Sequence, residues 1–224
     1  PTTNTIPGGT QMLIAHYEGD GTFGGSDSVA SSAITVTPEA SKTAVALQAF
    51  DPQTGVQTNP NVTTATYGQS IYLLRTDVTD SAGTACAPVP VGQSACPTGN
   101  VTITDNGNPL DGGTFTLNSL GYTEDQQINV TGGTHNIQAQ YGGDASFNAS
   151  SNPDAFTIAK APTSFTAFSI PATTSADIPV LYSATVSSQS FGAEPGGTIT
   201  FFSDGVPISA QPFGSGSSGT ATGA

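Results

Sequence analysis

Apolar and polar residues alternate with a period of two along most of this chain, the pattern of half-buried β-strands. The segment KTAVALQAF is one example, and turn sequences such as DNGNP and YGGDAS separate it and its successors. Helical periodicity is absent, because Gly, Pro and β-branched residues interrupt every candidate window. The first part of the pattern predicts strands at residues 42–50, 69–79, 100–107, 113–120, 125–130, 133–141 and 154–160.

Seven short strands in a stretch of this length are typical of an immunoglobulin-like β-sandwich. The sequence therefore predicts an all-β fold in which residues 41–160 form one complete sandwich, named here the central module.

The strand pattern restarts in residues 161–224, named here the tail segment, and stops before the last two strands of a second sandwich. Strand interiors match in kind, as Ile178 does with Ile71 and Ile199 with Val101. The matched segments are 163–170 with 42–50, 176–186 with 69–79, and 196–208 with the segment GNVTITDNGNPL.

The two strands that the tail segment lacks are found in residues 1–40, named here the head segment. The same spacing of 124 residues separates Gly8 from Gly132 and Tyr17 from Tyr141. This internal repeat predicts that the head segment supplies the last two strands of an immunoglobulin-like module. The matched segments are 9–17 with 133–141, and 31–39 with PDAFTIAK.

Neither part of a divided sandwich can bury its apolar face alone. Three arrangements complete it. The tail segment folds back onto the head segment of the same chain, or it receives the head segment of another copy in an open head-to-tail filament. In the third, the chain is one period of a longer tandem array. The ends SGTATGA and PTTNTIPGGTQ would join smoothly as strand, loop and strand, which favours the two axial arrangements.

A motif of the form Tyr-x-Gly-Asp-x-x-Phe ends a predicted strand in both the head segment and the central module. Together with YGQSIYLL and GNVTITDNGNPL, it resembles the bacterial Ig-like repeat family found in tandem in large surface and adhesin-like proteins. The resemblance covers nearly the whole chain. It implies a β-sandwich that serves as spacer, stalk or adhesive module, normally without catalysis. The motif residues are Tyr17, Gly19, Asp20 and Phe23, and Tyr141, Gly143, Asp144 and Phe147.

Charge excludes several classes of partner. Charged residues make up 8% of the chain, and the net charge of −13 includes only three basic residues. No basic patch is available for phosphates, so neither nucleic acid nor anionic lipid is an expected partner. No apolar run is long enough to span a bilayer, and no signal-peptide pattern precedes Pro1.

No catalytic constellation can be assembled, since the chain has neither a Gly-x-Ser-x-Gly nor a His-Glu-x-x-His motif. We therefore expect no enzymatic activity. The two histidines, His16 and His135, are expected to be solvent-facing strand residues.

The cysteines Cys86 and Cys96 lie in one short loop, CAPVPVGQSAC, with no His nearby. This favours a loop-closing disulfide over a metal site or free thiols. Such a bridge stabilises by about 3 kcal/mol in the chain-entropy account. It indicates an oxidising, extracellular or cell-surface location.

Two kinds of candidate site remain. Asp20 and Asp144 are weak candidates for calcium, with Asp27 near the first. No second carboxylate sits at ligand spacing, so we expect each to bind nearby backbone N–H groups instead, and expect no cofactor. The sequons for N-glycosylation begin at Asn61, Asn100, Asn129 and Asn148.

These patterns predict a structural repeat unit of an extracellular filament, stalk or surface fibre, whose partners are copies of itself or adjacent repeats. The alternative is an adhesin or carbohydrate-binding module that contacts a carbohydrate or a host surface. An exposed aromatic cluster would favour the alternative, and Phe191, Phe202 and Phe213 are its candidates.

Overall fold

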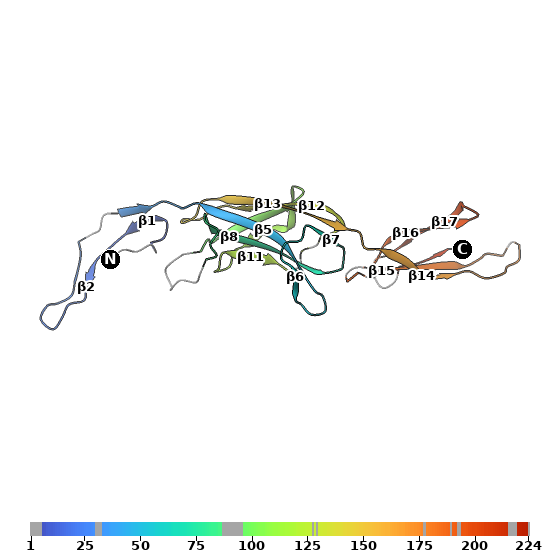
Figure 1. The fold of residues 1–224 in the computed structure, drawn as a ribbon, viewed down its shortest axis with the longest axis horizontal. Helices are drawn as coiled ribbons and strands as arrows, with labels where there is room; N and C mark the ends of the chain where they lie inside the picture. Colours follow the sequence, from blue (N-terminus) through green and yellow to red (C-terminus); the bar gives the residue numbers. More distant parts are fainter. Residues whose placement is uncertain are drawn as a thin grey trace.

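The computed structural model is an elongated molecule built from strands, with no helix among the residues it describes. The head segment lies at one end of the long axis, the central module in the middle and the tail segment at the other end (Figure 1). The described residues are 6–29, 33–86, 96–126, 128, 130–176, 178–188, 190–191, 194–214 and 219–223.

The central module is a sandwich of two sheets, which confirms the all-β prediction. Strand pairs are antiparallel except β13 with β7, which is parallel. One sheet has the order β11 (Tyr122–Asp125), β8 (Ile71–Asp80), β5 (Ser41–Phe50), β6 (Gln57–Asn59). The other has the order β10 (Asn108–Thr116), β9 (Asn100–Asp105), β12 (Gly133–Tyr141), β13 (Ser150–Ala159), β7 (Thr64–Thr66).

Period-two alternation places the core of this module. Every second residue of β5 from Thr43 to Ala49 is buried, and so is every second residue of β12 from His135 to Tyr141. The two sheets thus present their apolar faces to each other. Each fully buried aliphatic or aromatic side chain contributes roughly 1.5–3 kcal/mol. The most deeply buried side chains include Leu47, Leu74, Val101, Ile103, Phe156 and Ile158.

Two predicted strands are placed differently. The strand expected at 125–130 is β11, at Tyr122–Asp125, whereas Ile128 and Val130 enter the core from outside any strand. The strand expected at 113–120 begins at Asn108, because positive φ angles at Asn106 (49°) and Gly107 (82°) form a tight hairpin turn directly after β9. The short edge strands β6 and β7 were not predicted.

The head segment forms two short strand pairs, β1 with β4 and β2 with β3, in place of the two continuous strands expected. The strands of the head segment pair with each other in the same register as β12 pairs with β13. Gly9 lies opposite Val36 as Gly133 lies opposite Ile158. Tyr17 lies opposite Ser26 in the same way that Tyr141 lies opposite Ser150. The strands are β1 (Gly9–Met12), β2 (His16–Tyr17), β3 (Ser26–Asp27) and β4 (Ala33–Val36).

The tail segment contains a three-stranded sheet, β14–β15–β18, and a hairpin, β16–β17. The turn of the hairpin has φ angles of 49° at Asp204 and 80° at Gly205, which match those at Asn106 and Gly107. The strands are β14 (Thr163–Ser169), β15 (Tyr182–Ser188), β16 (Gly197–Ser203), β17 (Val206–Phe213) and β18 (Gly219–Gly223).

In β15 the buried residues are Tyr182, Ala184 and Val186. Their equivalents in β8 are the buried residues Leu74, Thr76 and Val78. This match is shifted by one residue from the predicted alignment, which placed Ile178 on Ile71. A slip of one residue exchanges the two faces of a strand, so the pairing partners decide the match. With this phase β18 pairs with β15 as β11 pairs with β8.

In their pairing, the strands of the tail segment resemble β5, β8, β9, β10 and β11, and those of the head segment resemble β12 and β13.

Candidate functional site

The Tyr-x-Gly-Asp-x-x-Phe loop of the central module follows β12. Gly143 has φ = 84°, and a Cβ there would lie 2.9 Å from the carbonyl oxygen of Phe147. Asp144 then fixes the loop, because its Oδ1 accepts hydrogen bonds from the backbone N–H of Ser146 (2.7 Å) and of Phe147 (2.8 Å). The Asp side chain therefore has the loop-fixing role expected of it.

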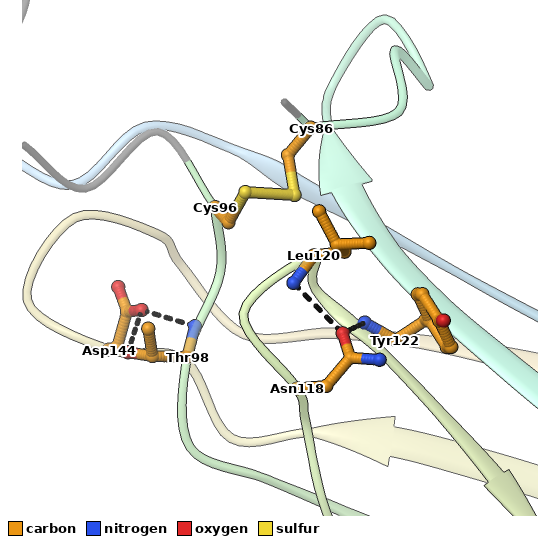
Figure 2. Close-up of a disulfide and its surroundings, with 7 residues drawn as sticks. All are labelled: Cys86, Cys96, Thr98, Asn118, Leu120, Tyr122 and Asp144. Atoms are coloured by element: carbon orange, nitrogen blue, oxygen red, sulfur yellow. Dashed lines mark hydrogen bonds between the residues drawn. A yellow bond between two sulfur atoms is a disulfide. The ribbon is translucent and has the colours of Figure 1, made fainter. Parts of the chain in front are cut away.

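The second carboxylate oxygen of Asp144 reaches across to the segment before β9. Its Oδ2 accepts hydrogen bonds from the backbone N–H of Thr98 (2.8 Å) and from the Thr98 hydroxyl (2.7 Å) (Figure 2). Burial raises the pKa of Asp144, but the hydrogen bonds from Thr98, Ser146 and Phe147 outweigh it and hold the pKa below its usual 3.8. An ionised carboxylate thus joins two strands of one sheet.

The head segment repeats this loop. Asp20 Oδ1 accepts hydrogen bonds from the N–H groups of Thr22 (2.7 Å) and Phe23 (2.8 Å), which lower its pKa. Gly19 has φ = 89°. In this chain, however, no described residue takes the place that Thr98 has beside Asp144.

The aromatic residues of the two motifs differ in burial. Tyr141 and Phe147 are 2% and 3% exposed, whereas Tyr17 and Phe23 are 47% and 66% exposed. Further apolar side chains of the head segment are also exposed, among them Met12, Leu13, Ile14 and Ile34. The head segment therefore repeats the motif without the burial that its aromatic residues have in the central module.

The tail segment has an open apolar hollow. Its volume is about 390 Å³. Among the side chains of this segment that the structure describes, only a small cluster of five around Tyr182 and Phe201 is buried. The hollow is lined mainly by Phe165, Phe168, Ile170, Tyr182, Ile199 and Phe201.

Both end segments are hydrogen-bonded to the central module. Glu39 N donates to the carbonyl oxygen of Ser146 (2.9 Å), and Asn148 N donates to that of Glu39 (2.8 Å). At the other junction, Phe191 N donates to the carbonyl oxygen of Gly68 (2.6 Å). These bonds restrain the direction in which each end segment leaves the central module.

Cys86 and Cys96 are joined by a disulfide, with their Cα atoms 5.2 Å apart (Figure 2). Beside it, Asn118 Oδ1 accepts a hydrogen bond from the N–H of Leu120 (2.9 Å). The bridge ties the chain after β8 to the segment that carries Thr98 into β9.

The prediction that both histidines face solvent is wrong for His135. Its side chain lies inside the sandwich and stacks on Phe156 with 5.0 Å between ring centroids. Its Nδ1 lies 2.6 Å from Asp105 Oδ2 and its Nε2 lies 2.9 Å from the carbonyl oxygen of Thr131. Because both ring nitrogens have polar partners, the imidazole can be buried at modest cost. His16 is exposed, as expected.

Sequence reasoning also missed a network around the only arginine. Arg75 donates two hydrogen bonds to Asp77 (2.9 and 2.8 Å) and one to Glu124 (2.8 Å). Its guanidinium lies 3.9 Å from the centre of the Tyr122 ring. The hydrogen bonds with Asp77 raise the pKa of Arg75 against the effect of burial.

The remaining candidates are not gathered into one place. Asp27 lies 2.5 Å from His16 rather than beside Asp20. Within the described ranges, no group of three or more His, Cys, Asp or Glu side chains could hold a metal ion, and no helix could cross a membrane. Asn61, Asn100 and Asn148 are exposed, and Asn129 lies outside the described residues.

Comparison with known proteins agrees with the fold of the central module. Residues 56–159 match a family model described as bacterial Ig-like domain (group 3). No curated protein and no solved structure matches the chain. Domains of this family are generally structural modules, typically extracellular or on a cell surface, and without enzymatic activity. Residues 56–159, which make up most of the central module, are therefore similar to the bacterial Ig-like domains of this family.

Proposed function

We propose that this chain is a structural repeat unit of an extracellular filament, stalk or surface fibre, with Ig-like modules arranged head-to-tail. One observation carries the proposal: the strands that the tail segment lacks have their counterparts in the head segment, at the opposite end of the long axis (Figure 1). Complementary ends that face apart generate an open, linear assembly.

The rest of the molecule is consistent with a role in extension. The disulfide between Cys86 and Cys96 suits an oxidising environment outside the cell, and residues 56–159 match bacterial Ig-like domains, which are typically extracellular or on a cell surface. The hydrogen bonds at Glu39 and Gly68 limit bending at both junctions. Stiffness and length are then the useful properties.

The test is small-angle X-ray scattering and negative-stain electron microscopy of the purified full chain over a wide range of concentration. We expect rod-shaped particles that lengthen with concentration. A compact monomer at every concentration, with the head and tail segments closed on each other, would contradict the proposal.

A second candidate function is an adhesin or carbohydrate-binding module, favoured by exposed aromatic side chains on the tail segment. Phe191 and Phe202 are 55% and 62% exposed. Phe213 instead packs against the small buried cluster of the tail segment, so it does not belong to the expected exposed patch. Binding on a glycan array that is lost in a Phe191→Ala/Phe202→Ala variant would support this function. An array without any signal would count against it.

A further inference from the structure

We infer that the open edge of β16 is the docking site for residues 13–17 of a second copy of this chain, in a register that the central module specifies. This inference rests on the proposed head-to-tail function and names its interface. In the central module β9 is paired on both sides, with β10 and with β12. Its counterpart β16 pairs only with β17 among the described strands.

The register follows from the pairing of β12 with β9. There Tyr141 lies opposite Val101, Gln140 opposite Thr102 and Ala139 opposite Ile103. Because the head segment repeats β12 and β16 repeats β9, the same geometry pairs residues of two chains. It places Tyr17 of one copy opposite Ile199 of the other, His16 opposite Thr200, and Ala15 opposite Phe201.

Strand addition of this kind satisfies backbone groups that an edge strand leaves unpaired. The incoming strand already has its other edge paired, since His16 and Tyr17 lie opposite Asp27 and Ser26 in β3. One docking event therefore extends the β16–β17 hairpin by two strands. The outcome is the strand order of β10–β9–β12–β13.

The apolar side chains of the two copies complement each other. In the central module, the positions equivalent to Tyr17, Phe23 and Ile34 are Tyr141, Phe147 and Phe156, which are at most 3% exposed. The three head residues are 40–66% exposed in this chain. The hollow of about 390 Å³ in the tail segment is where they would be buried.

The same docking gives Asp20 its missing contact. Thr98, which binds Asp144 Oδ2, lies directly before Gly99 at the start of β9. The equivalent residue of the tail segment is Gly196, directly before Gly197. The Gly196 N–H of one copy would donate to the carboxylate of Asp20 of the other.

The junction between modules is completed as well. Ala161, which follows β13, occupies the position equivalent to that of Glu39, which follows β4. In the loop of the head segment, the positions equivalent to Ser146 and Asn148 are Thr22 and Gly24. The bonds that Glu39 makes to the central loop therefore have inter-chain counterparts at Ala161.

The decisive experiment is a site-directed cross-link between two variants that each add one free cysteine to the natural disulfide, His16→Cys and Thr200→Cys. Both side chains are exposed, and directly opposite residues of antiparallel strands have Cα atoms about 4.5–5.5 Å apart, within the range of a disulfide. Thr198→Cys is the matched control, since it lies on the same face of β16 but about 7–8 Å away on the diagonal. Mild oxidation should link His16→Cys chains to Thr200→Cys chains and leave Thr198→Cys chains largely unlinked.

A second variant measures the loop contact. Asp20→Ala should weaken self-association in sedimentation roughly tenfold or more, because a hydrogen bond to a charged group is lost. Asp51→Ala is its control, since Asp51 accepts the same kind of bonds from Gln53 and Thr54 (2.9 and 2.7 Å) within the central module. It should leave association unchanged.

Each outcome is informative. Filaments that form without the Thr200→Cys link, or with an equal Thr198→Cys link, overturn this register and leave the proposed function standing. A chain that stays monomeric overturns docking of a second copy. If two copies of the chain fused end to end then form one rigid rod, the proposed function stands, with the modules joined covalently in a tandem array. If the fused chain is also flexible and its junction unfolded, both ideas fail.

Discussion

Replacing Asp144 with alanine tests whether the Tyr-x-Gly-Asp loop stabilises the sandwich. The carboxylate accepts four hydrogen bonds, two from the loop and two from Thr98. A hydrogen bond contributes about 0.5–1.5 kcal/mol net. The two bonds from Thr98 are exposed, so water replaces much of their contribution. We therefore expect Asp144→Ala to lower the free energy of unfolding by about 3 kcal/mol.

The assay is urea unfolding of the full chain followed by circular dichroism. With an m-value of about 2 kcal/mol/M, the midpoint of the central module should fall by about 1.5 M. Asp20→Ala is the matched control, because the same loop in the head segment has no contact with the central core, and its midpoint should not move. A change below about 0.3 M for Asp144→Ala would refute the reasoning.

The same variant has a pH signature. The pKa of Asp144 is lower in the folded chain than its ordinary value of 3.8. Its stabilising effect is therefore complete above pH 3.8 and is lost as the pH falls through the lowered pKa. The difference between the natural chain and Asp144→Ala should shrink as the solution is acidified below that value.

Three further predictions concern other parts of the central module. Mass spectrometry without reductant should give a mass lower by two hydrogen atoms than that of the reduced chain, and replacing Cys86 and Cys96 with serine should cost about 3 kcal/mol of stability; free thiols would contradict the structure. Burial raises the pKa of Tyr72 and Tyr141, and the charge of Asp144 further raises that of Tyr141. Absorbance titration should therefore show phenols that resist ionisation until the chain unfolds, and stability should decrease as the pH rises above 10.0, whereas a simple titration of all six tyrosines near pH 10 would be inconsistent with it. Arg75→Ala should lower stability by about 1–2 kcal/mol, since it leaves two partly buried carboxylates unpaired, and a midpoint unchanged in urea would argue against that role.

Much of the fold was determined by local sequence. Alternation identified β5, β8 and β12 nearly to the residue, since a strand with one face in the core must repeat its apolar positions every second residue. The repeated motif identified the loops of Asp20 and Asp144 as equivalent, because a positive φ at the preceding glycine and an acceptor at the aspartate are local requirements. The cysteine spacing gave the disulfide for a similar reason.

Other features depend on partners distant in sequence. His135 lies inside because its register in β12 points it inward, and Asp105, on the neighbouring strand, makes that burial tolerable. The phase of β15 depends on its pairing with β14 and β18, not on its own apolar pattern, which fits two registers. Arg75 acquires Glu124 only when β8 and β11 are adjacent.

The sequence by itself determined the strand and loop signals of the central module and their repetition in the head and tail segments, because those signals are local. Only the tertiary structure decided where those segments lie. The short, hydrogen-bonded junctions at Glu39 and Gly68 direct the head and tail segments away from each other, so the apolar side chains of both remain exposed. The direction in which each end segment leaves the central module depends on contacts between segments, and the alternation of apolar and polar residues within a strand carries no information about it.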